Sequence, residues 1–234
     1  KYLLFDANGD ERPDLLAATI DTRTGYVRVY ANDGQGDFTK VLSSLPIPAA
    51  AIPAPGGASV AVVGAKAFDF TGDGFQDLAL IYTDYDKIRM IELYVNDGHG
   101  KFIDETAQRL PVFKSHVWPV NVNFVDMNGD GFVDILAKNG TTSPILLNDG
   151  KGFFHQLPNL FPDRSTDDYF PGDFNNDGRM DLAIYQGTGP ESDYYALALA
   201  IDTPAEQTGD ASDNGIMGDS GGETLSGLAG NDVI

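Results

Sequence analysis

The chain has 234 residues, 42% of them apolar, and its 35 acidic and 15 basic residues give a formal charge of −20 at pH 7. A chain this acidic repels nucleic acid and anionic membranes, and no cluster of Lys and Arg offsets the repulsion, so we expect neither as a partner. The absence of Cys excludes disulfides, zinc–thiolate sites and Cys nucleophiles. No apolar run of about 18 residues is present, so we expect no membrane insertion.

Two short strings alternate along the chain. One is rich in Asp, and its four copies are 6-DANGDERPD-14, 69-DFTGDGFQD-77, 126-DMNGDGFVD-134 and 173-DFNNDGRMD-181. The other is an Asn-Asp-Gly turn, which begins at Asn32, Asn96 and Asn148. This alternation indicates a repeat of roughly fifty to sixty residues, a period typical of propellers and solenoids.

Each repeat predicts four antiparallel strands. A strand-like stretch such as 120–125 enters the Asp-rich string, and a short apolar run such as 134–137 leaves it, as expected of a strand buried on both faces. A third stretch, for example 88–95, ends at the Asn-Asp-Gly turn, a strong hairpin signal, and a fourth stretch follows. We therefore predict an all-β fold over residues 1–204, a β-propeller of about four four-stranded blades, although the fourth repeat has no Asn-Asp-Gly turn.

Residues 205–234 differ in character, being rich in Gly, Asp, Ser and Asn. They repeat every nine residues, with Gly209, Gly218 and Gly227 in register and an aliphatic residue seven positions after each. A flexible linker would have this composition too. The regular period favours the incomplete start of a parallel β-roll that binds calcium.

Positions one, three, five and nine of the Asp-rich string carry carboxylate, amide or hydroxyl oxygens, and glycines stand between most of them. Calcium takes about six to eight oxygen ligands, and alternate residues of a tight loop can point at one ion while the backbone carbonyl of position seven fills a gap. An EF-hand is excluded because position twelve, which is Ala17 in the first copy, is apolar. Magnesium is a weaker alternative, since it prefers fewer protein ligands.

The chain therefore predicts four calcium loops and one further ligand in the tail. The predicted metal ligands are Asp6, Asn8, Asp10, Arg12, Asp14, Asp69, Thr71, Asp73, Phe75, Asp77, Asp126, Asn128, Asp130, Phe132, Asp134, Asp173, Asn175, Asp177, Arg179, Asp181 and Asp232. The residues at position seven would bind through their backbone carbonyls. The third and fourth loops are complete, whereas Thr71 is a weak ligand in the second and Glu11 replaces a turn glycine in the first.

The Asp-rich string with its following aliphatic strand, together with the Asn-Asp-Gly-x-Gly-x-Phe turn, resembles the FG-GAP/VCBS repeats that build integrin-α-like β-propellers. The resemblance covers about residues 1–202 and implies a calcium site in the loop between two strands of each blade. The tail resembles the RTX, or haemolysin-type, nonapeptide, most closely around Asp232. That second resemblance implies a large bacterial protein that is exported by type I secretion and folds on meeting external calcium.

Nothing in the sequence indicates catalysis. His99, His116 and His155 have no partner at metal-ligand spacing, and no Gly-x-Ser-x-Gly, His-Glu-x-x-His or phosphate loop occurs. We therefore expect a fragment of a secreted or cell-surface protein that acts as a non-catalytic interaction or adhesion module and binds a glycan or an extracellular protein. The alternatives are a spacer and an accessory domain of a secreted calcium-dependent enzyme whose catalytic domain lies outside this sequence. The oligomeric state is not indicated.

Aromatic residues in the segments between strands are the candidates for stacking on a sugar, and packing between blades is their competing role. They are Trp118, Tyr169, Phe170, Tyr194 and Tyr195.

Overall fold

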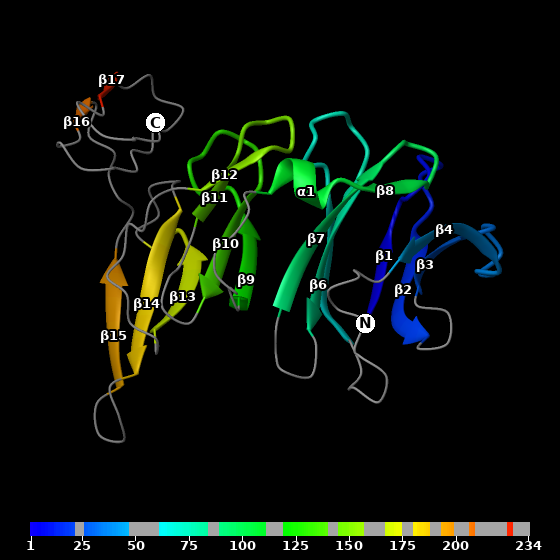
Figure 1. The fold of residues 1–234 in the computed structure, drawn as a ribbon, viewed down its shortest axis with the longest axis horizontal. Helices are drawn as coiled ribbons and strands as arrows, with labels where there is room; N and C mark the ends of the chain where they lie inside the picture. The colour runs from blue at the N-terminus through cyan, green and yellow to red at the C-terminus, as the bar shows by residue number, and fades with distance from the viewer. Residues whose placement is uncertain are drawn as a thin grey trace. The chain divides into compact units, whose positions relative to one another are not determined.

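In the residues that it describes, the computed structural model is all-β apart from one short helix (Figure 1). It describes residues 1–21, 26–46, 61–83, 89–110, 119–139, 145–156, 167–174, 180–187, 193–198, 206–208 and 224–226. Within these ranges, no helix is long and apolar enough to cross a membrane.

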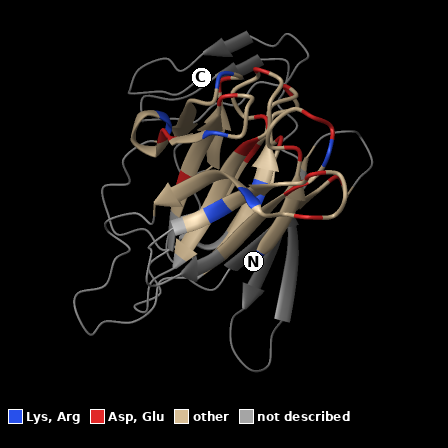
Figure 2. Ribbon diagram, turned by 90° about the vertical axis from the view of Figure 1, so that its right-hand side faces the viewer, with Lys and Arg blue, Asp and Glu red and all other residues tan. Residues whose placement is uncertain are grey.

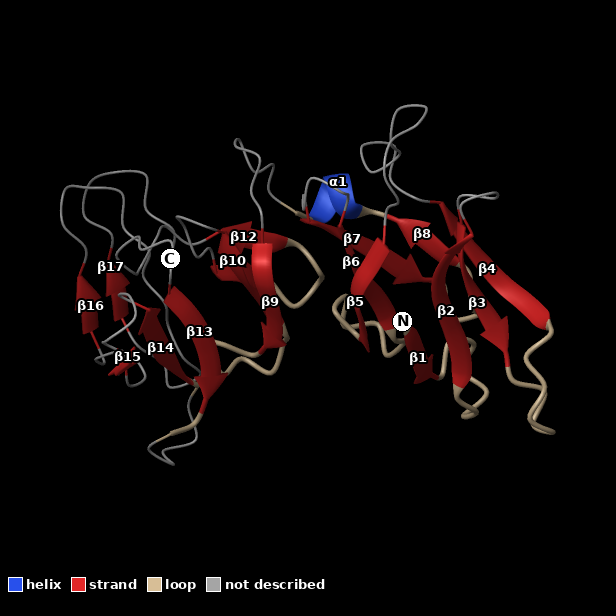
Figure 3. Ribbon diagram, turned by 90° about the horizontal axis from the view of Figure 1, so that it is seen from below, coloured by secondary structure: helices blue, strands red, loops and turns tan. Residues whose placement is uncertain are grey.

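Three four-stranded antiparallel sheets follow one another along the chain (Figure 3). The first contains β1 (Tyr2–Phe5), β2 (Asp14–Asp21), β3 (Tyr26–Ala31) and β4 (Lys40–Pro46). The second contains β5 (Ala61–Phe68), β6 (Asp77–Thr83), β7 (Arg89–Asn96) and β8 (Phe102–Asp104). The third contains β9 (Pro119–Val125), β10 (Asp134–Asn139), β11 (Ile145–Asn148) and β12 (Phe154–Gln156). In each sheet, strands that are neighbours in sequence pair, which confirms the predicted four-stranded repeat for three of the four copies.

The fourth repeat and the tail differ from these sheets. In the described part, the fourth repeat is a three-stranded antiparallel sheet of β13 (Asp167–Gly172), β14 (Asp181–Gly187) and β15 (Asp193–Ala198). In the tail, β16 (Glu206–Thr208) and β17 (Thr224–Ser226) pair in parallel, with Gln207 opposite Leu225. These partners are 18 residues apart (225 − 207), which is two of the nine-residue periods. The β-roll, and the boundary between residues 204 and 205, stay predictions.

The burial of the strands follows their sequence pattern. Every residue of β6 from Leu78 to Tyr82 is buried, as expected of a continuous apolar strand that is covered on both faces. In β3, Val27 and Val29 are buried and alternate with half-buried residues.

The chain divides into two compact units, one made of residues 1–118 with 150–153 and the other of the remaining residues. In the first unit, a hydrophobic core lies between one face of the first sheet and one face of the second. The ring of Phe5 meets the ring of Phe102 edge to face there, with centroids 6.0 Å apart. Because burial of apolar surface is the main driving force of folding, this core holds the two sheets together.

The helix α1 (Thr106–Arg109) is not predicted by the sequence pattern. Four residues are too few for a helix that is stable alone, so contacts from elsewhere must support it. Arg109 supplies such a contact, because its Nη1 donates to the carbonyl oxygen of Lys151 at 2.6 Å. Its Nε donates to Oε2 of the N-cap residue Glu105 at 2.8 Å. Its guanidinium also lies 4.9 Å from the centroid of the Phe153 ring.

Glu92 on β7 is a buried carboxyl group, only 7% exposed. The hydroxyl Oγ1 of Thr106 lies 2.8 Å from Glu92 Oε2 and 2.7 Å from Asp104 Oδ1, so its single proton serves one carboxylate at a time. Burial raises the pKa of Glu92 to about 7, and the charge of Asp104 adds to the effect. Burial raises the pKa of Tyr82 to about 12 and also raises that of Tyr94, and the charge of Glu92 adds to both shifts.

We expect the stability of the protein to fall as the pH rises from 4.5, the ordinary pKa of this group, to about 7, because the folded protein binds the proton of Glu92 more tightly than the unfolded chain does. Glu92→Gln should match the parent at pH 4 and exceed its free energy of unfolding by on the order of 2 kcal/mol at pH 8. Urea unfolding at both pH values measures this difference. Asp37→Asn, at an exposed position, is the control and should keep the parent's pH dependence of stability. If Glu92→Gln also kept it, the raised pKa of Glu92 would be contradicted.

Candidate metal centres

Each described Asp loop joins the first two strands of a sheet: residues 6–14 join β1 to β2, 69–77 join β5 to β6, and 126–134 join β9 to β10. Figure 2 shows acidic residues on the loops more than on the strands. The glycines at positions four and six have φ between 73° and 92°, the left-handed region that favours glycine. Glu11, at φ 63°, is the only non-glycine residue with positive φ in the described part of the chain, as its place at position six predicts.

The carboxylate at position one is the group around which each loop turns. In the second loop, the N–H of Gly72 donates to Asp69 Oδ1 at 2.7 Å and the N–H of Gly74 donates to Asp69 Oδ2 at 2.8 Å. Asp6 and Asp126 accept the equivalent bonds in the first and third loops. Position one therefore shapes the loop in addition to presenting two oxygens.

The carboxylates at position five, Asp10, Asp73 and Asp130, are exposed, and each accepts the N–H of position seven at 2.8–3.0 Å. At position three, Asn8 and Asn128 donate from Nδ2 to the neighbouring carboxylate at 3.1 and 3.0 Å. The side chains of positions three and five are thus adjacent in the first and third loops.

The carboxylates at position nine, Asp14, Asp77 and Asp134, have no exposed surface. One oxygen of each accepts the N–H of position two at 2.8–3.1 Å, and the other accepts the N–H of the Asn that begins the next Asn-Asp-Gly turn at 2.8–2.9 Å. Burial raises the pKa of Asp77 to about 6 and that of Asp134 to about 7, and the charges of Asp130 and Asp126 add to the second shift. Burial also raises the pKa of Asp14.

Position nine therefore has a second role that the sequence pattern does not reveal. Its carboxylate bonds the Asp loop to the Asn-Asp-Gly turn of the same repeat. The bonded residues lie 14 to 19 positions apart in the chain. The strict alternation of the two strings was the available signal, since a turn that must be bonded to a loop has to recur with it.

The second loop brings three predicted ligand positions together. Thr71 Oγ1 lies 3.4 Å from Asp69 Oδ1 and 3.1 Å from Asp77 Oδ2. Carboxylate, amide and hydroxyl oxygens are the hard ligands that calcium prefers, so the donor types of the three described loops fit this ion. In the described ranges, no group of three or more His, Cys, Asp or Glu side chains is arranged to hold a metal ion, so the structure does not bring the three Asp side chains of any described loop together as a cluster.

The remaining predicted ligands are described only in part. Asp173 is exposed at the start of the fourth loop. Asn175, Asp177, Arg179, the side chain of Asp181, and Asp232 lie outside the described residues, and their role in metal binding stays a prediction.

Repeated four-stranded antiparallel sheets, each with an Asp loop bonded to a Gly-rich turn, define an all-β repeat protein whose sheets are consistent with propeller blades. Within that class, the chain belongs to the FG-GAP-like repeat family, whose model matches residues 6–79 and 69–137. This confirms the resemblance to FG-GAP repeats over residues 6–137, whereas its extension to residue 202 and the RTX resemblance of the tail stay predictions.

Two solved structures are distantly similar to the chain. One is a lectin of Agrocybe aegerita, described as recognising non-reducing terminal N-acetylglucosamine, with 16% identity, a TM-score of 0.45, and coverage of 86% of this chain and 52% of that one. The other is the Tc holotoxin pore of Photorhabdus luminescens, with 21% identity, a TM-score of 0.45, and coverage of 83% of this chain and 8% of that one. The chain thus spans about half of the first protein and less than a tenth of the second. No curated protein matches its sequence.

Proposed function

We propose that the chain is a calcium-binding, non-catalytic interaction module, a β-propeller whose Asp loops are stabilised by the ion. The observation that carries the proposal is the recurrence of one loop, with hard oxygen donors at the same positions, in three described sheets. When bound, calcium would neutralise the clustered carboxylates. The residues that would hold it are those at positions one, three, five and nine, with the carbonyl of position seven.

Replacing one exposed carboxylate should remove one calcium equivalent from the protein. We expect Asp130→Asn to weaken calcium binding at the third loop by roughly tenfold or more, because the number of charged ligands sets the affinity of such sites. Isothermal titration calorimetry with calcium measures the stoichiometry and the affinity. The matched control is Asp149→Asn, which changes an Asp of the following turn that is not a predicted ligand.

Loss of one equivalent in Asp130→Asn but not in Asp149→Asn would support the proposal. A parent protein that is folded and takes up no calcium would overturn it.

Exposed aromatic rings on the Asp loops offer a surface for a partner. Phe75 and Phe132, at position seven of the second and third loops, are 41% and 36% exposed. Phe170, a sugar-stacking candidate from the sequence, is 50% exposed. The side chains of the other four candidates lie outside those the structure describes. Rings of this kind stack on sugars or pack against protein.

The partner is proposed to be a glycan or an extracellular protein. A glycan array probed with the folded chain, once with calcium and once with a chelator, tests the first class. Calcium-dependent binding that Phe75→Ser and Phe132→Ser weaken would support a lectin-like module. If the folded protein bound no glycan, the glycan proposal would fail. A protein partner would then remain, together with the alternative roles of spacer and of accessory domain beside an enzyme.

We also propose that the protein acts outside the cell and that the tail is the start of an RTX-type roll. The parallel pairing of β16 with β17 at a spacing of two nonapeptides supports the roll. Secretion by a type I system follows only from that resemblance. Export of a longer protein carrying this tail from a host with such a system, and its retention without one, would test the route.

A further inference from the structure

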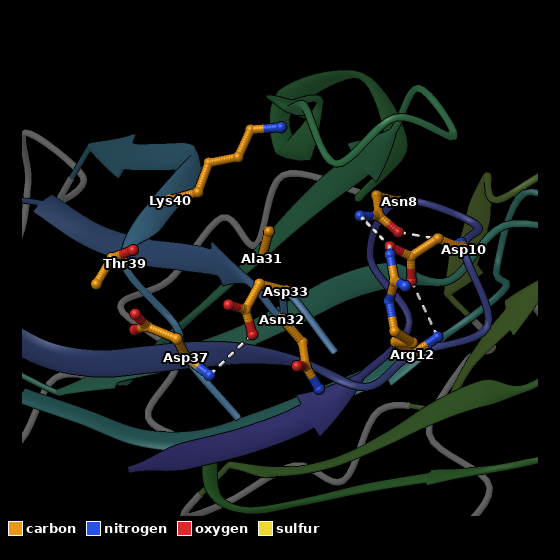
Figure 4. Close-up of a pocket in the computed structure, with 9 residues that line it drawn as sticks. All are labelled: Asn8, Asp10, Arg12, Ala31, Asn32, Asp33, Asp37, Thr39 and Lys40. Carbon is orange, nitrogen blue, oxygen red and sulfur yellow. Dashed lines mark hydrogen bonds and ion pairs between the residues drawn. The ribbon is translucent and has the colours of Figure 1, made fainter. Parts of the chain in front are cut away.

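The first Asp loop contains its own cation. Arg12, at position seven, donates from Nη2 to Asp10 Oδ2 at 2.8 Å, which is an ion pair within the loop. The same oxygen accepts a second bond from Asn8 Nδ2 at 3.1 Å. Figure 4 shows the three side chains meeting at this carboxylate. Asp10 is a predicted calcium ligand, so the guanidinium occupies an oxygen that calcium would need.

The other two described loops have no such cation. Position seven is Phe75 in the second loop and Phe132 in the third, and in each the position-five carboxylate accepts the backbone N–H of that residue. In the first loop Asp10 Oδ1 accepts the N–H of Arg12 in the same way, at 3.0 Å. The backbone is therefore alike in the three loops, and the charge at position seven distinguishes the first.

The side chain of Arg12 also lies close to the Asn-Asp-Gly turn of its own sheet. A Cβ placed on Gly34, in the turn of the first sheet, would lie 3.3 Å from Cδ and 3.4 Å from Nη1 of Arg12. Gly98, the equivalent glycine of the second sheet, faces the ring of Phe75 in the same manner. The side chain at position seven thus lies against the turn glycine in both sheets, and in the first sheet that side chain carries the charge that pairs with Asp10.

We infer that the guanidinium of Arg12 replaces calcium in the first Asp loop, so that this loop keeps its shape without metal and binds calcium far more weakly than the second and third. A cation fixed at the site satisfies the carboxylate and repels a second cation. The inference rests on the proposed calcium function. Arg179 stands at the same position of the fourth loop in sequence, outside the described residues, so the inference concerns the first loop alone.

The test is calcium titration of the whole 234-residue chain by isothermal titration calorimetry. Arg12→Phe places in the first loop the residue that the second and third loops carry. We expect this variant to bind one calcium equivalent more than the parent and, in chelator, to melt about 2–4 °C lower, since an uncompensated Asp10 remains. Lys40→Ala is the control, because Lys40 lines a pocket of about 190 Å³ together with Asp10 and Arg12 but makes no ion pair with Asp10 (Figure 4).

Asp10→Asn provides a second readout that does not depend on how Arg12→Phe folds. The inference requires that Asp10→Asn leave the number of bound calcium ions unchanged, whereas Asp130→Asn lowers it by one. An equal loss in both variants, or no gain in folded Arg12→Phe, overturns the inference and leaves the proposed function standing. If the parent and every folded variant take up no calcium, the proposed function fails and this inference fails with it.

Discussion

Asp77→Ala is expected to lower the free energy of unfolding by about 4 kcal/mol in calcium-free buffer. The Asp77 carboxylate has no exposed surface and accepts the N–H groups of Phe70, Thr71 and Asn96 at 2.9–3.2 Å. Alanine leaves these donors without their partner, the bonds of Phe70 and Asn96 are buried, and each buried donor left unpaired costs about 1–3 kcal/mol. Urea unfolding followed by circular dichroism, in the presence of a chelator, measures the loss.

Asp73→Ala is the matched control, since it removes a carboxylate from the same loop at an exposed position with one backbone bond. It should cost less than about 1 kcal/mol without calcium. The two variants thus separate the structural carboxylate from one whose main proposed role is to bind the ion. Equal losses of stability would show that position nine does not tie the loop to its turn.

Gly152→Ala should be the most harmful of the glycine substitutions in the Asn-Asp-Gly turns, with a loss of about 3 kcal/mol. Gly152 has φ 81°, and a Cβ there would lie 2.6 Å from Nη1 of Arg109, 2.9 Å from the ring of Phe70 and 3.1 Å from the carbonyl oxygen of Phe70. The Phe70 ring is fully buried and the carbonyl belongs to the backbone, so neither can move away cheaply.

Gly36 occupies the same motif position in the first sheet, with φ 92° and no atom within 4 Å of the added Cβ. Gly36→Ala should therefore cost only the conformational strain, about 1 kcal/mol. Thermal unfolding of both variants separates the cost of the left-handed backbone conformation, which both share, from the cost of close packing around the added Cβ, which only Gly152→Ala has. If Gly36→Ala were as destabilising as Gly152→Ala, the backbone conformation alone would explain both glycines.

The sequence predicted the strands, the sheets and the loops well because their signals are local. An apolar run such as 78–82 and the glycines of the Asp loops report directly on burial and on backbone conformation. The fourth strands of the second and third sheets have a weaker signal, since β8 and β12 have only three residues each.

What the sequence could not predict depends on partners far along the chain. The helix α1 needs Arg109 to reach the carbonyl of Lys151, 42 residues away, and no local pattern marks that contact. The Arg12–Asp10 pair is close in sequence, but its proposed effect on calcium binding follows only from comparing the three loops in space, where Phe75 and Phe132 hold the position of Arg12. The sequence pattern predicts position seven as a ligand through its carbonyl and gives its side chain no role.

The side-chain amide of Asn96 donates hydrogen bonds to two different repeats. One goes to the carbonyl of Gln76 in its own repeat and the other to the carbonyl of Ala7 in the preceding one, each at 2.9 Å. Ser43 Oγ likewise accepts the N–H of Phe102 across the same border, at 3.3 Å. A chimera that exchanged the second sheet alone would cut through these bonds. A segment that carries the second sheet must therefore include the Asp loop and the last strand of the first sheet if these bonds are to be kept.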